Sequence, residues 1–179
     1  KANIELRYSS DPQAPNQGSL VQSAIDSDVA GIAVTMPNAN AMGPAAQLAV
    51  DAGIPVVGLN AGMEDYEKYG LSGFFGQEEG VAGQKAGERL REEGAKKTLC
   101  VIHEQGNSSQ EARCDGIREG LSGGTVEILY VNGQDLTSVK STVQSKLAQD
   151  SSIDWVMGLV TPVSLVVADA AESTGAEVH

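Results

Sequence analysis

The sequence has few positively charged and few aromatic residues, and each shortage excludes a class of function. Lys and Arg number 12 against 24 Asp and Glu, which gives a formal net charge of −12 at pH 7. Binding to nucleic-acid phosphates or to an anionic membrane surface needs clustered Lys and Arg, so this balance argues against both. With two Phe, four Tyr and one Trp in 179 residues, the chain also lacks aromatic platforms for single-stranded nucleic acid.

Cysteine, histidine and long apolar runs are equally scarce. Two Cys residues are too few for a disulfide scaffold, and Cys100 and Cys114 do not have the spacing of a zinc-binding pair. We therefore expect no metal site, while the question whether the two cysteines pair with each other stays open. No apolar run reaches the roughly 18 residues of a membrane span. What remains is a soluble, acidic globular protein with 21 Gly residues.

Short apolar segments alternate with helix-like segments along the whole chain. The predicted strands are Asn3–Tyr8, Ala30–Thr35, Pro55–Leu59, Lys97–His103, Thr125–Val131 and Asp154–Val160. The predicted helices are Asn16–Ser27, Ala41–Gly53, Glu78–Gly94, Ser108–Leu121, Leu136–Gln149 and Pro162–Gly175. Most strand segments, such as "GIAVTM" and "TLCVI", are apolar without a break, which is typical of parallel strands covered on both faces.

Residues at the ends of the predicted helices support these boundaries. Gly53, Gly94 and Gly175 lie where a helix C-cap needs a left-handed residue. Asp135 and Thr161 are placed to cap helix N-termini. The small residues of "GVAGQKAG" lie inside a predicted helix, where we expect them to allow close packing of that helix on a sheet rather than to bind phosphate.

The spacing of the strands predicts the domain organisation. Strands begin near residues 3, 30 and 55, and then near 97, 125 and 154. These are two sets of three β-α units, separated by the irregular segment Met63–Gln77. Repeated βαβ units form parallel sheets with helices on their faces, so two α/β lobes are favoured. One doubly wound sheet of six strands is the alternative.

Reactive groups do not converge in the sequence. There is no G-x-S-x-G nucleophile motif, and His103 is the one plausible general base, because the second histidine is terminal. We interpret His103 as a hydrogen-bonding group rather than a base. Adjacent carboxylates such as Glu78 and Glu79 diverge on a helix and do not form a catalytic pair. The sequence therefore predicts no catalytic residues and no cofactor.

Polar groups instead collect at the carboxyl ends of the predicted strands, where open α/β sheets bind ligands. These groups are Thr35, Asn38, Asn60, Gln77, His103, Asn107, Asn132 and Thr161, with Arg113 on the following helix. Amides, hydroxyls and one guanidinium suit a neutral polyhydroxylated ligand better than they suit turnover.

Several of these segments resemble a known family. "VQSAIDSDVAGIAVTMPNANAMGPAAQLAVDAGIPVVGLNAG" resembles the N-terminal lobe of the type I periplasmic sugar-binding proteins, the ribose- and galactose-type receptors of ABC importers. "FFGQEEGVAGQKAGERLREEG" is similar to their crossing strand and next helix, and "TLCVIHEQGNSSQEARCDGIREGL" to the start of their second lobe. "DWVMGLVTPVSLVVADAAESTG" resembles a later strand-helix unit. The resemblance implies two Rossmann-like lobes, each a parallel sheet flanked by helices.

The resemblance also implies a ligand site and a function. The residues that it assigns here are Asn60, Gln77, Glu79, Arg113 and Thr161, and the predicted site also includes His103 and Asn107 because they follow the fourth strand. The implied function is binding of a sugar or polyol in the cleft between the lobes, without catalysis. The Asp-Arg pair of ribose receptors reads Asn60-Ala61 here, and the later Asn-Asp pair is missing at Thr161, so a ligand other than ribose is expected.

By the same resemblance the fold is incomplete at both ends. Residues 1–77 match part of the N-terminal lobe without its first strand and helix. Residues 78–179 match the crossing helix and part of the C-terminal lobe without its last strands. The resemblance further implies a monomeric, extracytoplasmic receptor, periplasmic or lipid-anchored, which docks on a membrane permease. In such an oxidising compartment a Cys100–Cys114 disulfide becomes a possible pairing.

The same fold resembles the effector-binding core of lac-repressor-type transcription regulators, and this is the alternative function. Such a regulator would be cytoplasmic and would carry a DNA-binding helix-turn-helix. The acidic charge favours the receptor.

Overall fold

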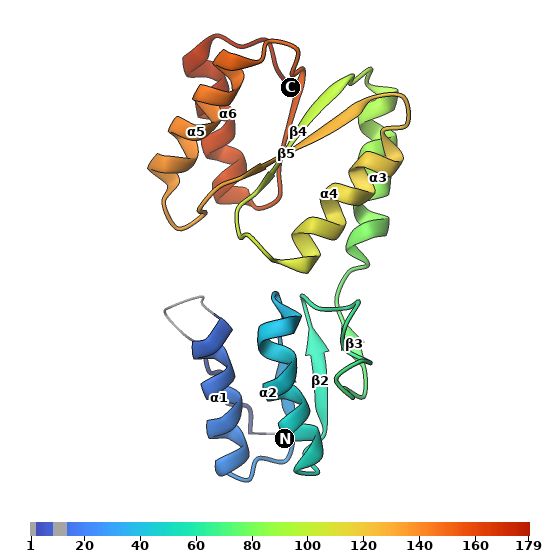
Figure 1. Ribbon diagram of the computed structural model, residues 1–179, viewed down its shortest axis with the longest axis vertical. Helices are drawn as coiled ribbons and strands as arrows, with labels where there is room; N and C mark the ends of the chain where they lie inside the picture. The colour runs from blue at the N-terminus through green and yellow to red at the C-terminus, as the bar shows by residue number, and fades with distance from the viewer. Residues whose placement is uncertain (1–2, 9–13) are drawn as a thin grey trace. The chain divides into compact units, whose positions relative to one another are not determined.

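The computed structural model describes residues 3–8 and 14–179 (Figure 1). The chain divides into two compact units, residues 1–77 and residues 78–179. Within the described residues each unit is built on its own parallel sheet of three strands. The α/β class with parallel sheets flanked by helices is confirmed, and the alternative of one six-stranded sheet does not form.

Unit 1 is built on a small sheet with the strand order β1-β2-β3. Its elements are α1 (Ala14–Asp26), β1 (Ile32–Val34), α2 (Ala39–Asp51), β2 (Val56–Leu59) and β3 (Phe74–Phe75). Met36, Met42 and Val56 are almost completely buried in its core. Because β2 pairs with β3, the residue after β2 lies beside the last residue of β3: the Asn60 N–H donates to the Phe75 carbonyl at 2.9 Å.

The strand predicted at Asn3–Tyr8 does not form. A strand needs a hydrogen-bonded neighbour, and no described strand pairs with this segment. Its apolar side chains stay in water: Ile4, Leu6 and Tyr8 are 87%, 82% and 80% exposed. The alternation of apolar and polar residues indicated β propensity, which does not form a strand without a partner.

Unit 2 is a three-layer α/β/α arrangement on a sheet of order β5-β4-β6 (Figure 1). Its elements are α3 (Glu79–Glu92), β4 (Lys97–Ile102), α4 (Ser108–Gly120), β5 (Thr125–Tyr130), α5 (Leu136–Gln149), β6 (Trp155–Gly158) and α6 (Thr161–Thr174). Cys100 and Ile102 of β4 belong to the core formed with α3 and α4, whereas Leu99 and Val101 belong to the core formed with α5 and α6. All four side chains are fully buried, so the unbroken apolar run does belong to a strand covered on both faces.

Most of the predicted helix caps are confirmed. The three glycines assigned to C-caps all have a left-handed φ: Gly53 (+80°), Gly94 (+89°) and Gly175 (+67°). Asp135 caps α5, since its side chain accepts a hydrogen bond from the Ser138 N–H at 2.9 Å. The prediction for Thr161 is wrong, because Thr161 is the first helical residue of α6 and Val160 occupies the cap position without a side-chain bond.

Glycines hold α3 and α4 side by side at backbone contact (Figure 1). A Cβ atom on any of four glycines would lie 2.1–2.3 Å from a carbonyl oxygen of the other helix: Gly83 from Arg113, Gly87 from Ile117, Gly116 from Gly80, and Gly120 from Gln84. The expectation that the small residues of Gly80–Gly87 pack on a sheet is therefore corrected. Their partner is a helix with its own matching glycines, and only glycine allows backbones this close.

Replacing Gly83 with Ala should destabilise unit 2, because the new Cβ would lie 2.1 Å from the Arg113 carbonyl oxygen and would force the helices apart. We expect the free energy of unfolding to fall by about 1–3 kcal/mol, measured by urea denaturation. Gly80→Ala is the matched control on the same helix, since its Cβ would meet no atom within 4 Å. The control should be neutral or stabilising by up to about 1 kcal/mol. Equal losses in both variants would contradict the role given to the helix contact.

Four charged side chains form an ion-pair network where β4 begins. The Lys97 Nζ lies 2.5 Å from Asp150 Oδ2 and 3.2 Å from Glu127 Oε2, and Lys146 contacts both carboxylates. Hydrogen bonds from Lys97, and then from Ser152, hold the pKa of Asp150 well below its usual range. The hydrogen bond from Lys146 is the main cause of a lowered pKa at Glu127.

These lowered pKa values make the stability of unit 2 depend on pH in the acidic range. A carboxylate whose pKa is lower in the folded state stabilises the fold above its unfolded pKa, which is about 4, and loses that contribution as the pH falls further. Asp150→Asn should therefore lower the melting temperature at pH 7, and its difference from the wild type should shrink between pH 4 and pH 2. Calorimetry over this range provides the measurement.

Glu92→Gln is the control for this prediction, because Glu92 is exposed and has no ion-pair partner among the described residues. The control should follow the wild type at every pH. A difference between Asp150→Asn and wild type that stays constant from pH 7 to pH 2 would contradict the prediction.

Candidate functional site

In unit 1, two predicted site residues follow adjacent strands at the carboxyl edge of the sheet. Asn60 directly follows β2 and has a left-handed φ of +63°, a conformation that Asn tolerates better than most residues. Gln77 follows β3 two residues after Phe75. Both side chains are exposed, and neither has a hydrogen-bond partner among the described residues. Two amide groups are therefore available to a ligand in this unit.

In unit 2, hydrogen bonds in the loop after β4 determine which ring nitrogen of His103 carries the proton. The His103 and Glu104 N–H groups donate to Gln110 Oε1 at 3.0 and 3.3 Å, so the Gln110 Nε2 must be the group that donates to His103 Nε2 at 3.2 Å. A neutral His103 then carries its proton on Nδ1, which is buried without a hydrogen-bond partner. Burial lowers the pKa of His103, and the nearby Glu104 opposes this effect. His103 is consequently neutral at pH 7.

Asn107 has a local structural task. It is 8% exposed, and its side-chain oxygen accepts hydrogen bonds from the Ser109 and Gln110 N–H groups at 3.1 and 3.2 Å. Its Nδ2 donates to Glu104 Oε2 at 2.9 Å. Asn107 is thus the N-cap of α4, which accounts for the residue without a ligand.

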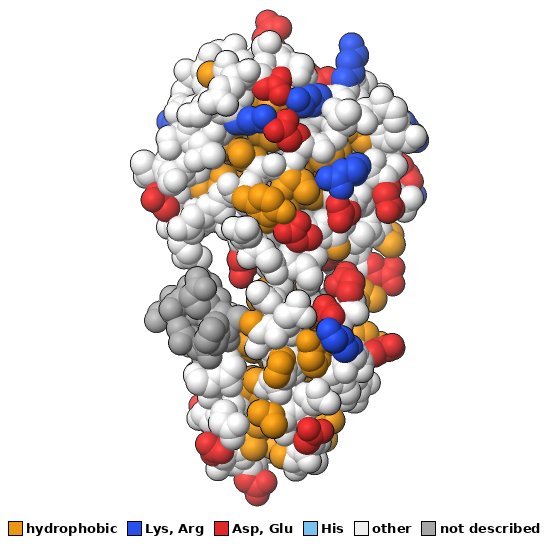
Figure 2. Space-filling view, in the orientation of Figure 1, with side chains coloured by type: hydrophobic (Ala, Val, Ile, Leu, Met, Phe, Trp, Pro, Cys, Tyr) orange, Lys and Arg blue, Asp and Glu red, His pale blue; other side chains and the backbone are white. Residues whose placement is uncertain are grey.

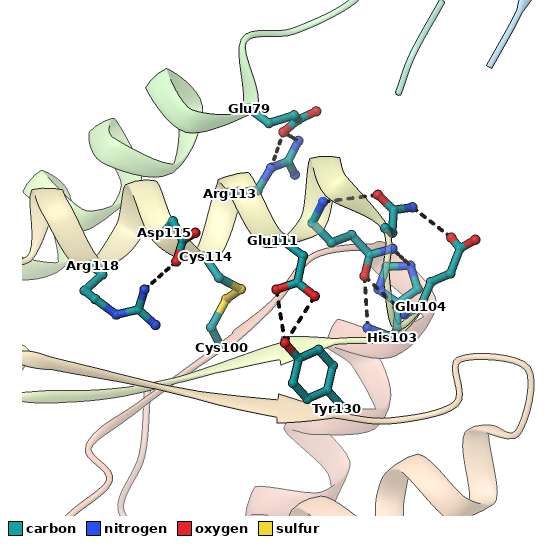
Figure 3. Close-up of a disulfide and its surroundings, with 12 residues drawn as sticks. Glu79, Cys100, His103, Glu104, Glu111, Arg113, Cys114, Asp115, Arg118 and Tyr130 are labelled. Atoms are coloured by element: carbon teal, nitrogen blue, oxygen red, sulfur yellow. Dashed lines mark hydrogen bonds and ion pairs between the residues drawn. A yellow bond between two sulfur atoms is a disulfide. The ribbon is translucent and has the colours of Figure 1, made fainter. Parts of the chain in front are cut away.

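Arg113 and Glu79 are brought together by the α3–α4 contact (Figure 3). The Arg113 Nε lies 2.5 Å from Glu79 Oε2, and the Arg113 Nη2 contacts the same oxygen. The Glu79 side chain is 10% exposed and the Arg113 side chain 27%. The geometry follows from the glycine contact, because Gly83 lies one turn after Glu79 and touches the Arg113 carbonyl oxygen.

A disulfide joins Cys100 of β4 to Cys114 of α4 (Figure 3). The Cα atoms are 6.0 Å apart and both residues are fully buried. Cys114 directly follows Arg113, so the bond ties the backbone that carries Arg113 to the central strand of the sheet. A covalent link across 14 residues also limits how far α4 can move from β4.

Sequence reasoning missed two aromatic side chains at the carboxyl ends of strands. Phe75 ends β3 and is 70% exposed, and Tyr130 ends β5 and is 45% exposed. The Tyr130 hydroxyl donates to the Glu111 carboxylate, 3.1 Å from both oxygens (Figure 3). Burial first, and then Glu111, raises the pKa of Tyr130. Their position at the carboxyl ends of strands could have identified both residues as site candidates.

Thr161 makes no side-chain interaction among the described residues and is exposed at the start of α6. In the part of the chain that the structure describes, no three His, Cys, Asp or Glu side chains group as a metal site requires. None of the described helices combines the length and apolarity needed to cross a bilayer. On the face drawn in Figure 2, Lys and Arg side chains are scattered among Asp and Glu rather than gathered in one patch.

A groove of about 450 Å³ lies between β6, α6 and the end of the chain. Its lining is mostly apolar, with Val156, Val167 and Val178, and none of the predicted site residues lines it. The polar groups described above therefore lie outside this groove.

Comparison with known proteins identifies the fold. A family model described as "Periplasmic binding protein domain" matches residues 1–178. A carbohydrate transporter from Acidothermus cellulolyticus 11B, solved in complex with myo-inositol, is 43% identical with a TM-score of 0.93 over 98% of this chain. An ABC sugar transporter protein from Legionella pneumophila is 28% identical over 88% of the chain, with a TM-score of 0.81.

A solute-binding protein from Burkholderia graminis C4D1M, in complex with D-arabinose, is 21% identical over 92% of the chain with a TM-score of 0.79, which shows a shared fold. This chain spans 61%, 59% and 58% of the lengths of these three proteins. No significant relative was found among curated proteins. The match over residues 1–178 and the TM-score of 0.93 over 98% of the chain show that the chain belongs to the periplasmic binding protein family and has its type I fold.

Proposed function

We propose that this chain belongs to the solute-binding receptor of an ABC import system and binds a neutral sugar or polyol with side chains from both units. The observation that carries the proposal is the 43% identity, over 98% of the chain, with a carbohydrate transporter solved with myo-inositol. The relatives described above are transport proteins, which favours the receptor over a transcription regulator.

The chemistry of the described residues supports binding without catalysis. Asn60 and Gln77 offer free amide groups, and each amide both donates and accepts hydrogen bonds, as vicinal hydroxyls require. Arg113 has five N–H donors, and the contact with Glu79 uses those of Nε and Nη2 on one side. Both ring nitrogens of His103 are withdrawn from a ligand, because Nε2 is hydrogen-bonded to Gln110 and Nδ1 is buried, whereas a general base must reach the proton that it abstracts.

Membership of the family supports a proposal for location and partners. Such a receptor would act outside the cytoplasm, periplasmic or lipid-anchored, and would deliver its ligand as a monomer to a membrane permease. Ligand contacts from both units would stabilise a closed form. Asn60-Ala61 in place of an Asp-Arg pair, and Thr161 in place of an Asn-Asp pair, favour a ligand other than ribose.

A ligand panel tests the proposed function on the product of the complete gene. Myo-inositol, D-galactose, D-xylose and D-ribose are added singly, and the melting temperature is measured. A true ligand at 100 times its Kd stabilises the fold by about 2.7 kcal/mol. We expect one of the neutral compounds other than ribose to raise the melting temperature by an amount that corresponds to this stabilisation. No shift with any of them, or chemical turnover of a bound sugar, would contradict the proposal.

Arg113→Ala should weaken binding of the stabilising compound by about 1–3 kcal/mol, roughly 5- to 150-fold in Kd, because it leaves ligand hydroxyls unpaired. Arg118→Ala is the matched control on the same helix, since Arg118 is exposed and pairs with Asp115. Calorimetric titration should give the control a Kd within about twofold of the wild type. An unchanged Kd in Arg113→Ala would exclude Arg113 from the site.

A further inference from the structure

We infer that Glu79 is a positioning residue that neutralises Arg113 and thereby makes the site select uncharged ligands over anionic ones. This inference rests on the proposed function and assigns Glu79 a different task from direct ligand contact. It starts from the pair itself: the Arg113 Nε and Nη2 both contact Glu79 Oε2, and the carboxylate is the more buried partner.

The charges around Arg113 leave Glu79 as its counter-ion. On α4, Glu111 accepts a hydrogen bond from the Tyr130 hydroxyl, and Asp115 pairs with Arg118 (Figure 3). Glu78 precedes α3, is exposed, and makes no side-chain cap bond. Among the described residues, Glu79 alone forms an ion pair with Arg113. The guanidinium and its carboxylate therefore form a unit with no net charge.

A neutral pair and a free arginine recognise different ligands. An unpaired guanidinium attracts carboxylates and phosphates through charge-assisted, forked hydrogen bonds. When a carboxylate already occupies one side of that fork, an anionic ligand gains less from Arg113 and is repelled by Glu79. Hydroxyl groups carry no charge and keep the benefit of the remaining N–H donors. The pair thus lowers affinity for anions and retains affinity for polyols.

The pair also restricts the conformations of Arg113. A free Arg side chain must give up rotamer freedom when a ligand binds, which costs affinity. Here α3 and α4 are held at backbone contact by Gly83, and Cys114 is bonded to β4, so both ends of the Glu79–Arg113 contact are fixed by the fold. The N–H donors that are not bonded to Glu79 are consequently oriented before the ligand arrives.

The test compares a neutral and an anionic six-membered ring of similar size, myo-inositol and D-glucuronate, on the product of the complete gene. Calorimetric Kd values are measured for wild type, Glu79→Gln and Glu78→Gln. Glutamine keeps a side-chain oxygen for the Arg113 N–H groups but removes the charge. We expect wild type to prefer myo-inositol, and Glu79→Gln to shift the ratio of the two Kd values at least about tenfold towards glucuronate.

Glu78→Gln removes the same charge from the neighbouring residue and leaves the Arg113 pair intact, so its ratio should stay within about twofold of wild type. A parallel loss of affinity for both compounds in Glu79→Gln would show a merely structural role and overturn the inference. A wild-type preference for glucuronate would overturn it as well, although the receptor function would stand. Binding of neither these compounds nor the sugar panel would refute both.

Glu79→Asp covers the case in which Glu79→Gln does not fold. It keeps the negative charge on a shorter side chain, so we expect the preference for myo-inositol to persist while the Kd for myo-inositol rises. A Glu79→Asp protein that folds and prefers glucuronate would overturn the inference.

Discussion

The backbone contact between α3 and α4 is the constraint on which the organisation of unit 2 depends. Four glycines, two on each helix, remove the side chains that would otherwise keep the helices apart. The register of this contact places Arg113 of α4 against Glu79 of α3, and the next residue of α4, Cys114, bonds to Cys100 of the central strand. The packing of α3 on α4 thereby positions both the Glu79–Arg113 ion pair and the Cys100–Cys114 disulfide.

The two units differ in how the polar side chains that follow their strands are hydrogen-bonded. In unit 2, hydrogen bonds among His103, Glu104, Asn107 and Gln110 stabilise the loop after β4. The polar groups of this loop are therefore already hydrogen-bonded within the protein. In unit 1 the side-chain amides of the residues after β2 and β3 have no partner within the part of the chain that the structure describes. Under the proposed function, the oriented donors of unit 2 and the amides of unit 1 are each suited to hydroxyl groups without net charge.

Much of this fold could be predicted from the sequence, because its signals are local. The unbroken apolar run of β4 indicated burial on both faces, and the bounds Leu136–Gln149 of α5 were set by its Asp135 cap. Features that depend on partners far along the chain were missed. Residues 3–8 have β propensity without a neighbour, and the glycines of α3 gave no indication that their partner was a helix with glycines of its own. The Glu79–Arg113 pair spans 34 positions and follows only from that contact.

The central claim is that Glu79 acts on the ligand through Arg113, and a double-mutant cycle on these two residues tests it most directly. The Kd for myo-inositol is measured in wild type, Glu79→Gln, Arg113→Ala and the double variant. If Glu79 acts through Arg113, Glu79→Gln should weaken binding in the wild type but have little effect once Arg113 is removed, with a coupling energy of about 1 kcal/mol or more. Effects that add to within about 0.3 kcal/mol would contradict the claim.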